Sequence, residues 1–390
     1  MRVLIGFATS LSLTSMLMPI PGNAATEGEL GAVAQAENRR ESPASDTRTP
    51  WVASGAPARV VGNVDVDVRT IRVLSYNIHI GRGLDDRFDL GRIADVINES
   101  GADLVSLQEV DQNASRSGNV DQPAVLASLT GMSVVFGKNR NHEGGGGYGN
   151  AVLSRFPMEC YRNNWLPREN PEDEPRGVLE VQLRVDSQPL VFLATHLHHR
   201  RSEPRDRLDS IAIFFCALDR LKEPALVAGD LNAFPEKEEM SRFFSFMGDS
   251  YESNEGGEYT APADDPDVRI DYILHDDHPR LSYRPGSYLI INDARTQVAS
   301  DHLPVYAEYD LEILPGRGSP WPCSSTVYVD GTRSVGGDGT PGRPYKQVAV
   351  AVGAAPEGSL IGIRGAIYDE PQSIAKGLCL CSYNGMVELR

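Results

Sequence analysis

The feature that most limits how this chain can fold is a series of short apolar segments that each end abruptly in polar residues. Between Thr70 and Glu312 these segments have the length and composition of β-strands, and helix-like segments separate several of them. The alternation predicts an α/β layered domain. Strands are predicted at residues 71–78, 103–107, 134–137, 149–154, 178–185, 190–197, 225–229, 269–275 and 304–311.

Two helices are predicted in this region from apolar residues at helical spacing. In the first, apolar residues recur from Leu90 to Ile97, and Gly101 ends the helix. In the second, Ser202 is the predicted cap and Pro204 opens the helix. One apolar face on a helix indicates packing against a sheet.

Polar residues follow the predicted strands at six places. Open sheets place ligand-binding groups at the ends of their strands, so the joint occurrence predicts one shared site. Each place alone is weak evidence, because Asp230 could form a turn, His196 could be a half-buried structural histidine, and Asp271 could be an edge charge. The six places are Tyr76-Asn77, Gln108-Glu109, Thr195-His196, Gly229 to Asn232, Ile270 to Tyr272 and Ser300 to His302.

In chain order these motifs resemble those of the endonuclease/exonuclease/phosphatase superfamily, which includes deoxyribonuclease I, abasic-site endonucleases, neutral sphingomyelinases and inositol polyphosphate 5-phosphatases. The resemblance implies a four-layer α/β sandwich, in which two central mixed β-sheets are flanked by helices. It also implies metal-dependent hydrolysis of a phosphate monoester or diester. The matching segments are 75–77, 107–109, 149–155, 195–197, 229–232, 270–272 and 300–302.

The resemblance assigns a metal centre to three of these residues. It implies that Glu109 and Asp301 bind the cation and that Asn77 holds Glu109 or a metal-bound water through its amide. Carboxylate oxygens are hard ligands, and Mg²⁺ typically takes one or two of them and completes its shell with water and phosphate. Mg²⁺ is therefore the expected cofactor, with Mn²⁺ as a substitute.

The same resemblance assigns proton transfer to the later motifs. Asp230 would take the proton of the attacking water, and Asn232 would steer that water or a phosphate oxygen. His302 would donate to the phosphate as it gains negative charge, and His196 would be a second phosphate-contacting or acid group. Asp271 would orient a histidine, and the sequence leaves open which one.

Three further residues are expected to contact phosphate, namely His79, Asn150 and Arg176. For Arg176, which opens a predicted strand, a surface charge is the alternative. The stretch Asn77 to Gly83 resembles the bacterial metal-dependent hydrolase branch near the sphingomyelinases and lipid-remodelling members. The motifs that also recur in that branch are Arg116-Ser117, Asp121-Gln122 and Tyr148 to Asn150.

The charge of the chain limits the substrate. The formal net charge is −17, and Ile71 to Asp310 carry 24 basic and 40 acidic side chains, a net charge of −16. An acidic surface repels long polyanions, so stable nucleic-acid binding is not expected. The favoured substrate is a small or lipid-linked phosphodiester, with sphingomyelinase- or phosphoinositide-like chemistry. A secreted nuclease of the same superfamily and a non-catalytic binding module on this fold are the alternatives.

The first 64 residues are expected to lie outside the catalytic domain, which is assigned to residues 65–314. Residues 1–24 combine Arg2, an apolar stretch and a small-residue site, which predicts a cleaved secretory signal peptide; an uncleaved anchor is the alternative. Residues 25–64 are polar and without an apolar period, which predicts a disordered linker. With no transmembrane segment expected after cleavage, the protein is predicted to be secreted or periplasmic. Its oligomeric state is left open.

Residues 315–390 differ in composition from the preceding domain and are rich in Gly, Pro and Ser. The segments Val327–Asp330, Gly337–Pro341 and Leu360–Tyr368 resemble the opening turn of right-handed parallel β-helix proteins. A solenoid generally needs three or more turns to bury a core, and this segment is too short for them. It is therefore predicted to be a β-rich appendage without a catalytic role. A truncated remnant, a lid on the first domain and a piece that pairs with another chain are the forms it could take.

The cysteines do not form a metal-binding pattern. Cys216 lies on the apolar face of the second predicted helix and is expected to be a buried thiol. Cys323 is a candidate disulfide partner of Cys379 or Cys381, and the spacing does not decide between them. Cys379 and Cys381 are separated by one residue, with no second pair or neighbouring His, so structural zinc is not indicated.

One basic cluster stands out against the acidic background. The favoured interpretation is a solvated loop and first helical turn, paired with acidic residues between positions 203 and 209. The alternative is a rim that contacts a phosphorylated headgroup. The glycine run 144–147 is likewise either a plain flexible loop or a mobile rim. The basic cluster consists of His198 to Arg201, Arg205 and Arg207.

Overall fold

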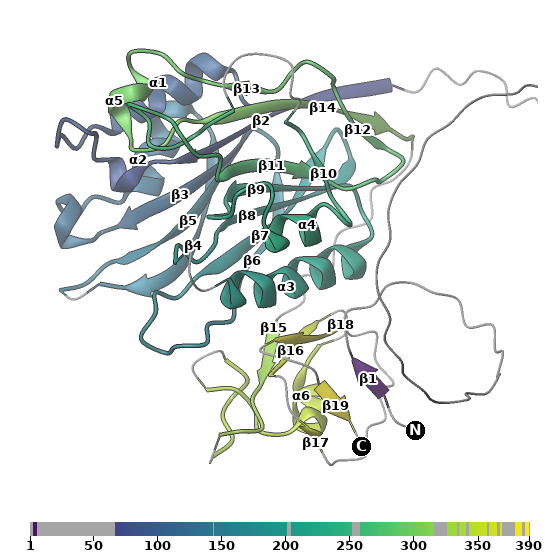
Figure 1. Cartoon of the computed structure of the whole chain (residues 1–390). Helices are drawn as coiled ribbons and strands as arrows, with labels where there is room; N and C mark the ends of the chain where they lie inside the picture. The colour runs from purple at the N-terminus through teal and green to yellow at the C-terminus, as the bar shows by residue number, and fades with distance from the viewer. Residues whose placement is uncertain are drawn as a thin grey trace, which may run out of the picture. The chain divides into compact units, whose positions relative to one another are not determined.

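The computed structural model describes residues 67–142, 144–200, 204–251, 258–315 and, with short gaps, 326–368 (Figure 1). It also gives the backbone of three short strands, β1 (Val3–Ile5), β18 (Cys379–Tyr383) and β19 (Val387–Leu389). Nearly all of the predicted signal peptide and the whole predicted linker lie outside the described residues, so both stay predictions.

Seven strands form the first sheet: β2 (Asp67–Asn77), β3 (Leu104–Gln112), β4 (Ser133–Asn141), β5 (Gly147–Ser154), β12 (Leu281–Tyr283), β13 (Leu289–Ile290) and β14 (Val305–Ile313). Their spatial order is β12-β14-β2-β3-β5-β4, with β13 beside β14. Strands β2 and β3 are parallel, and the other neighbours are antiparallel. The helix α1 (Leu90–Ser100) makes the crossover that a parallel pair requires.

Six strands form the second sheet: β6 (Met158–Trp165), β7 (Gly177–Val185), β8 (Gln188–His196), β9 (Ala225–Asp230), β10 (Gly248–Asp249) and β11 (Asp271–His275). Their spatial order is β10-β11-β9-β8-β7-β6. Here β8 and β9 are the parallel pair, connected by the helix α3 (Arg205–Leu221). Both sheets are therefore mixed, each with a single parallel pair near its middle.

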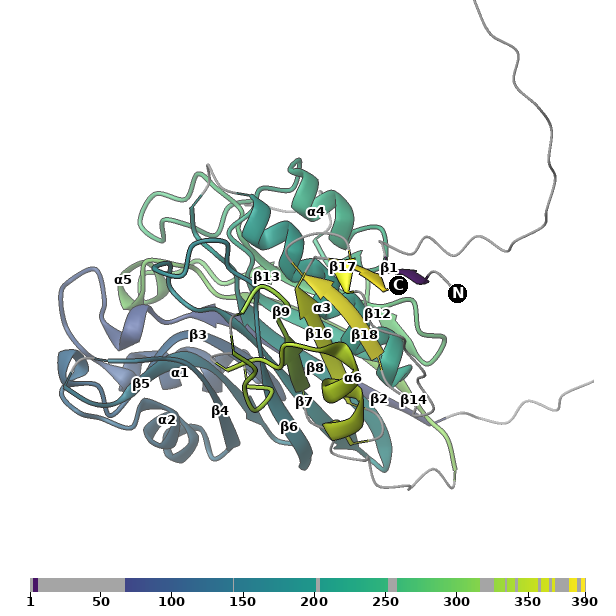
Figure 2. The same ribbon diagram turned by 90° about the horizontal axis from the view of Figure 1, so that it is seen from below.

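Helices cover the outer faces of the sheets. α1 and α2 (Gln122–Thr130) lie on the first sheet, and α3 and α4 (Glu238–Phe243) lie on the second (Figures 1 and 2). Asp89 caps α1 and Gly101 ends it, and α3 begins at Arg205 with Pro204 at its N-cap, which confirms both predicted helices. The predicted cap Ser202 lies outside the described residues. The shorter helical elements are η1 (His79–Gly81), η2 (Ser115–Ser117) and α5 (Thr296–Ala299). Within the described ranges, no helix has the length and apolar character needed to cross a membrane.

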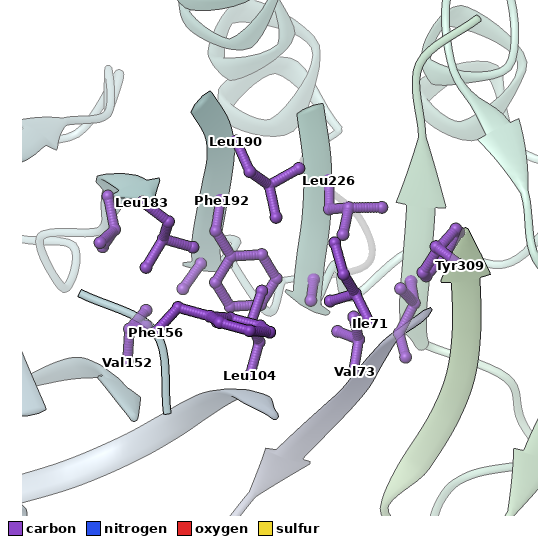
Figure 3. Close-up of a cluster of buried hydrophobic side chains, with 14 of the residues drawn as sticks. Ile71, Val73, Leu104, Val152, Phe156, Leu183, Leu190, Phe192, Leu226 and Tyr309 are labelled. Carbon is purple, nitrogen blue, oxygen red and sulfur yellow. The ribbon is translucent and has the colours of Figure 1, made fainter. Parts of the chain in front are cut away.

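The main core lies between the two sheets (Figure 3). Ile71 and Val73 of the first sheet and Phe192 and Leu226 of the second belong to one buried cluster. Strand β8 is buried along its whole length, because its opposite face packs against α3. Two sheets face to face with helices outside them confirm the predicted four-layer α/β sandwich.

The C-terminal segment forms its own small set of strands. β15 (Thr326–Val329), β16 (Leu360–Arg364) and β18 are parallel neighbours in chain order, and α6 (Val348–Ala354) lies between the first two along the chain. β17 (Ile367–Tyr368) pairs with β19, which also pairs with β1. Parallel stacking of successive strands is the arrangement of a β-helix. The absence of a catalytic role for this segment stays a prediction.

The expectation of a free buried thiol at Cys216 is wrong. Cys216 on α3 and Cys160 on β6 are both disulfide-bonded. Helical periodicity places Cys216 on a face of the helix but carries no information on a partner that is distant in sequence. The proposed pairing of Cys323 concerns side chains outside the described residues.

Candidate active site

The candidate site residues at the strand ends of the second sheet lie side by side. The register pairs Asp230, at the end of β9, with His196 at the end of β8 and with Asp271 at the start of β11. These three residues therefore form a row across adjacent strands. In the first sheet, Asn77 at the end of β2 pairs with Gln108 of β3.

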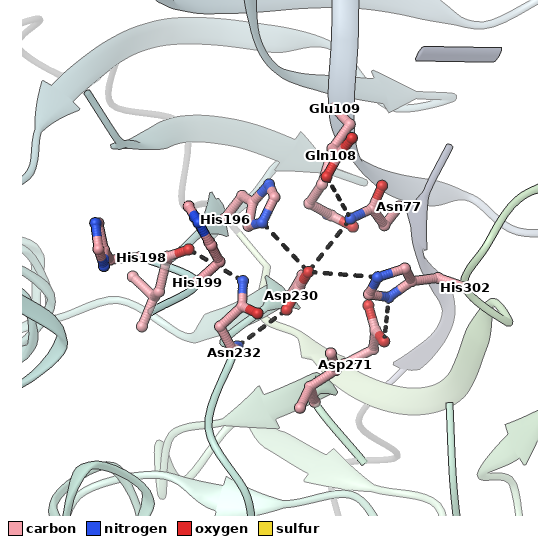
Figure 4. Close-up of polar contacts among 12 residues, drawn as sticks. Asn77, Gln108, Glu109, His196, His198, His199, Asp230, Asn232, Asp271 and His302 are labelled. Atoms are coloured by element: carbon pink, nitrogen blue, oxygen red, sulfur yellow. Dashed lines mark hydrogen bonds and ion pairs between the residues drawn. The ribbon is translucent and has the colours of Figure 1, made fainter. Parts of the chain in front are cut away.

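Asp230 is the centre of the site and is 2% exposed (Figure 4). Its Oδ2 accepts a hydrogen bond from Nδ2 of Asn77 at 3.2 Å. The same oxygen lies 3.3 Å from Nε2 of His196 and 3.8 Å from Nε2 of His302. Its Oδ1 accepts from the backbone N–H of Asn232 at 2.9 Å. Because Asn77 ends β2 and His302 lies in the loop that leads into β14, Asp230 joins the two halves of the sandwich.

Asp271 holds His302, which answers the question that the sequence left open. Its Oδ2 lies 2.9 Å from Nδ1 of His302, and the Asp271 side chain is 1% exposed. A buried carboxylate on one ring nitrogen fixes the orientation of the imidazole. The other nitrogen of His302 therefore faces Asp230.

Burial and neighbouring charges set the protonation of the cluster. Burial, and then the Asp271 carboxylate, raise the pKa of Asp230 to about 7. Burial opposes the charged form of His302, but the charge and hydrogen bond of Asp271 outweigh it and raise the pKa of His302 to about 10. Burial and the charge of Arg176 hold the pKa of His196 well below its usual value. At neutral pH His302 is therefore charged, His196 is neutral and Asp230 is close to its midpoint.

Glu109 lies beside this cluster at an irregularity of β3. The register between β3 and β5 shifts between Leu107 and Val110, and Glu109 has a φ of 57°. A non-glycine residue in this left-handed region is strained, and such strain collects at functional sites. The bulge brings the Glu109 carboxylate to Asn77, whose Nδ2 donates to Oε1 at 3.3 Å.

Asn77 is fully engaged by the protein. Its Oδ1 accepts from the backbone N–H of His79 at 3.1 Å, while its Nδ2 serves both Glu109 and Asp230. This arrangement favours the role of holding Glu109 through the amide, one of the two roles that the sequence left open for Asn77.

Asp301 and His79 form an exposed edge of the site. Their side chains are 38% and 36% exposed, and Oδ1 of Asp301 lies 3.9 Å from Nδ1 of His79. The hydroxyl of Ser300 donates to the carbonyl of Asn77 at 2.7 Å, which fastens the loop that carries Asp301 to the end of β2. The first sheet therefore presents Asp301 to solvent, together with the partly buried Glu109.

Arg176 is 8% exposed, so it is not a surface charge. Its Nη1 lies 3.2 Å from Oε1 of Glu174, and its buried Nε has no hydrogen-bond partner in the part of the chain that the structure describes. Its charge acts on His196, which shows that it borders the cluster. Asn150 instead uses its amide within the fold, donating to the carbonyl of Gly177 at 3.0 Å.

The basic cluster at residues 198–207 is the expected solvated loop only in part, because His199, Arg200 and Arg205 are exposed whereas His198 and Arg207 are buried. Arg207 is buried, and its Nη2 and Nε lie 2.7 and 2.9 Å from Oε1 of Glu239 in α4. Its Nη1 donates to two carbonyls of the preceding loop at 2.9 Å each. Arg205 does make a local pair, with Asp209 at 3.1 Å. The expectation failed for Arg207 because its partner is distant in sequence and reaches it only through the packing of α3 against α4.

Two groups of three His, Asp or Glu side chains in the described residues have ligand atoms within 4.8 Å of one another. The first is the cluster of Asp230, Asp271 and His302 itself. The second consists of Asp173, His198 and Asp206. In the second group the amide of Arg200 donates to Nδ1 of His198 at 3.3 Å, which leaves the proton on Nε2 facing Asp173. That nitrogen is therefore a donor and not a free ligand.

Tyr148 was not predicted as a site residue, although its motif was noted. Burial, and then the charge of Glu109, raise the pKa of Tyr148 well above its usual value, so the ring lies within electrostatic reach of the site. Tyr148 precedes Asn150 by two residues on β5, and side chains two apart on a strand point to the same face. The two-residue spacing from Asn150, which was a predicted phosphate contact, could have identified Tyr148 from the sequence.

The two packed mixed sheets define an α/β sandwich. The acidic and histidine side chains gathered at their strand ends form a candidate hydrolytic site. The sequence profile of the endonuclease/exonuclease/phosphatase family matches residues 74–302. The chain belongs to this family, whose members are hydrolases of phosphate esters.

Individual relatives are consistent with this membership. The uncharacterized protein YbhP of Escherichia coli K12 is 30% identical over 178 residues, which cover 43% of this chain and 69% of YbhP. The crystal structure of an endonuclease/exonuclease/phosphatase from Beutenbergia cavernae is 27% identical with a TM-score of 0.52, over 63% of this chain and 72% of that one. A family protein from Bacteroides thetaiotaomicron, 19% identical with a TM-score of 0.51 over 63% of this chain and 100% of its own, shows the shared fold.

Proposed function

We propose that the protein is an exported, divalent-metal-dependent phosphoesterase that hydrolyses a small or lipid-linked phosphodiester. The observation that carries this proposal is the position of Asp230. It is buried between two histidines, and Asn77 connects it to the Glu109 carboxylate. Family membership supports the class of reaction, and this cluster offers both a base and a cationic acid for it.

Asp230 serves as the base. A pKa of about 7 suits a group that must be ionised at neutral pH and still accept a proton readily. Oδ1 is held by the backbone of Asn232, and Oδ2 takes the proton of the water that attacks phosphorus. Nδ2 of Asn232 donates to the carbonyl of Leu197 at 3.1 Å, which leaves its side-chain oxygen to steer the water.

His302 provides a positive charge for the phosphate. Held by Asp271 and protonated at neutral pH, it donates from Nε2 to a phosphate oxygen as that oxygen gains charge. Arg176 supplies a second positive charge, which acts on the cluster through His196. His196, which is neutral, contributes a hydrogen bond and no charge.

The residues of the first sheet fit a hard divalent cation. Glu109 and Asp301 offer partly exposed carboxylate oxygens, and Asn77 orients Glu109. One or two carboxylates are what Mg²⁺ typically takes in sites shared with phosphate and water, and Mn²⁺ is the expected substitute. A cation bound there would supply Lewis-acid stabilisation of the phosphate and the leaving oxygen.

Export and substrate class have separate support. The predicted signal peptide and the disulfide bonds at Cys160 and Cys216 both favour an oxidising compartment. The net charge of −16 between Ile71 and Asp310 favours a substrate that is small or held in a membrane over a long nucleic acid.

A substrate panel on the purified protein tests the proposal. Initial rates are measured with Mg²⁺ and with EDTA on a chromogenic phosphodiester, sphingomyelin, phosphoinositides, inositol phosphates and plasmid DNA. We expect Mg²⁺-dependent turnover of a small or lipid-linked diester. Preferential cleavage of DNA would establish the nuclease alternative, and a lack of turnover on every substrate would favour the binding module.

A further inference from the structure

A second fixed cation lies next to the Glu109 side of the site. Asp111, two residues after Glu109 on β3, is fully buried. Arg116 of η2 binds it with two hydrogen bonds, from Nε to Oδ2 and from Nη2 to Oδ1, both 2.9 Å long. A two-pronged pair of this kind fixes the plane of the guanidinium.

The carboxylate that holds Arg116 is itself anchored. The backbone N–H of Asp111 donates to Oε1 of Gln122 at 2.9 Å, and Nε2 of Gln122 donates to the carbonyl of Ile80 at 2.6 Å. Nε2 of His142 also lies 3.3 Å from Oδ1 of Asp111, so this carboxylate keeps a neighbour when Arg116 is replaced. The guanidinium is thus positioned by Asp111 of β3, which is anchored in turn by α2 and η1.

Arg116 lies over the ring of Tyr148, with 4.9 Å between the guanidinium carbon and the ring centroid. Tyr148 shares a strand face with Asn150, and the charges of Glu109, Arg176 and Arg116 all act on it. Stacking on an aromatic ring restricts a guanidinium further while leaving its remaining N–H groups free to donate.

Two donors remain uncommitted in this arrangement. In the part of the chain that the structure describes, neither Nη1 of Arg116 nor the hydroxyl of Tyr148 has a hydrogen-bond acceptor. Although Nε and Nη2 of Arg116 bind Asp111, the Arg116 side chain is 42% exposed, so the edge of the guanidinium that carries Nη1 is accessible to solvent. The ion pair with Asp111 uses only the Nε and Nη2 edge of the guanidinium. The other edge and the hydroxyl are preorganised for an oxygen-rich anion.

We propose that Arg116 and Tyr148 form a subsite for a second anionic group of the substrate, a phosphate or carboxylate carried beyond the ester that is cleaved. The inference rests on the proposed phosphoesterase function and narrows its substrate to phosphodiesters with this extra charge. Arg116 is a specificity-determining residue in this scheme and takes no part in proton transfer.

Two matched substrates test the subsite. They are 4-nitrophenyl ethyl phosphate and the same diester with a terminal phosphate on its ethyl group. We expect the wild type to prefer the second in kcat/KM by about tenfold, the scale of one charge-assisted hydrogen bond. Arg116→Gln should bring this ratio close to one, and Tyr148→Phe should lower it less. The matched control is Arg284→Gln, an arginine of similar exposure that pairs with Glu308 on β14, and it should leave the ratio unchanged.

Binding without turnover separates this inference from the function on which it rests. Calorimetry in metal-free buffer compares ethylene bisphosphate with ethyl phosphate. Arg116→Gln should weaken the bisphosphate about tenfold more than the monophosphate. If neither diester is hydrolysed, the proposed function fails and the calorimetry alone decides on the subsite. Equal changes for both ligands, or an unchanged kcat/KM ratio in Arg116→Gln, would overturn the subsite.

Discussion

The two sheets contribute carboxylates of different kinds to one site. Glu109 on β3 and Asp301 in the loop before β14 are partly open to solvent, whereas Asp230 and Asp271 of the second sheet are almost completely buried. Carboxylate oxygens that are open to solvent can hold a cation. On the second sheet, burial raises the pKa of Asp230 to about 7, and the Asp271 carboxylate holds His302. In the proposed function this difference divides the labour, because the first half of the sandwich would hold the metal and the second would move the proton.

The largest expected effect comes from removing the buried base. Asp230→Asn keeps the shape and the hydrogen bond to Asn232 but cannot accept a proton, so kcat should fall by about 10³-fold with little change in substrate affinity. Single-turnover rates and equilibrium binding measure the two parts. The exposed Asp219→Asn serves as the control and should behave as wild type. Retained hydrolysis in Asp230→Asn would sink the base assignment.

Replacing the proposed metal ligand of the first sheet should weaken the affinity of the protein for Mg²⁺. EDTA is expected to abolish activity, and Glu109→Gln should raise the Mg²⁺ concentration for half-maximal rate by about 10- to 100-fold, because a carboxylate ligand is lost. Asp271→Asn should lower the rate without this shift. A Mg²⁺ titration of each variant makes the comparison, with Glu99→Gln as the surface control. An equal Mg²⁺ shift in Glu109→Gln and Asp271→Asn would remove the distinction between the sheets.

Protonation of the two histidines can be followed directly by NMR in the metal-free protein. His302 should stay charged until the pH approaches about 10, and His196 should stay neutral through the physiological range. A raised histidine pKa stabilises the fold fully below the unfolded value of 6.5, and this contribution is lost as the pH rises through about 10. Asp271→Asn should lower the pKa of His302. An unchanged value would show that Asp271 is not its cause.

The smallest expected effect is on stability and concerns Asp276, a half-buried carboxyl that follows the last residue of β11. Burial raises the pKa of Asp276 from 3.8 to about 6. The folded state therefore binds more protons between these values, and stability falls as the pH rises through about 6. Asp276→Asn should stabilise the protein by about 2 kcal/mol near pH 8 and leave it unchanged near pH 3. Urea unfolding at both pH values, with the exposed Asp277→Asn as control, measures this. A gain that is equal at both pH values would contradict a titration effect.

The same contrast explains how much of the fold was predictable. Strands such as β8 and β9 are buried on both faces, so they read as continuous apolar runs and were predicted. Strand β6, at the edge of its sheet, carries a mixed polar pattern and was not. The two- and three-residue strands β10, β12 and β13 are too short to carry any period and were also missed.

The residues of the candidate site could be predicted from the sequence, but the contacts between their side chains could not. The strand-end motifs named Asp230, Asp271 and His302 because short polar boxes after apolar runs are local features. The pairing of Arg207 with Glu239, and of Arg116 with both Asp111 and Tyr148, depends on segments that meet only after folding. The disulfide bond of Cys216 was missed for the same reason.

By itself, the sequence determined the layered α/β fold, the family and the identity of the acidic and histidine residues at the strand ends. Each of these can be predicted from local periodicity and from motifs of a few residues. Only the tertiary structure decided that Asp271 holds His302, that Asp230 is buried while Asp301 is exposed, and that Arg116 keeps a free edge. The physical reason is that register, burial and desolvation arise from contacts between distant segments, and these set the pKa of a carboxyl and the direction of a guanidinium.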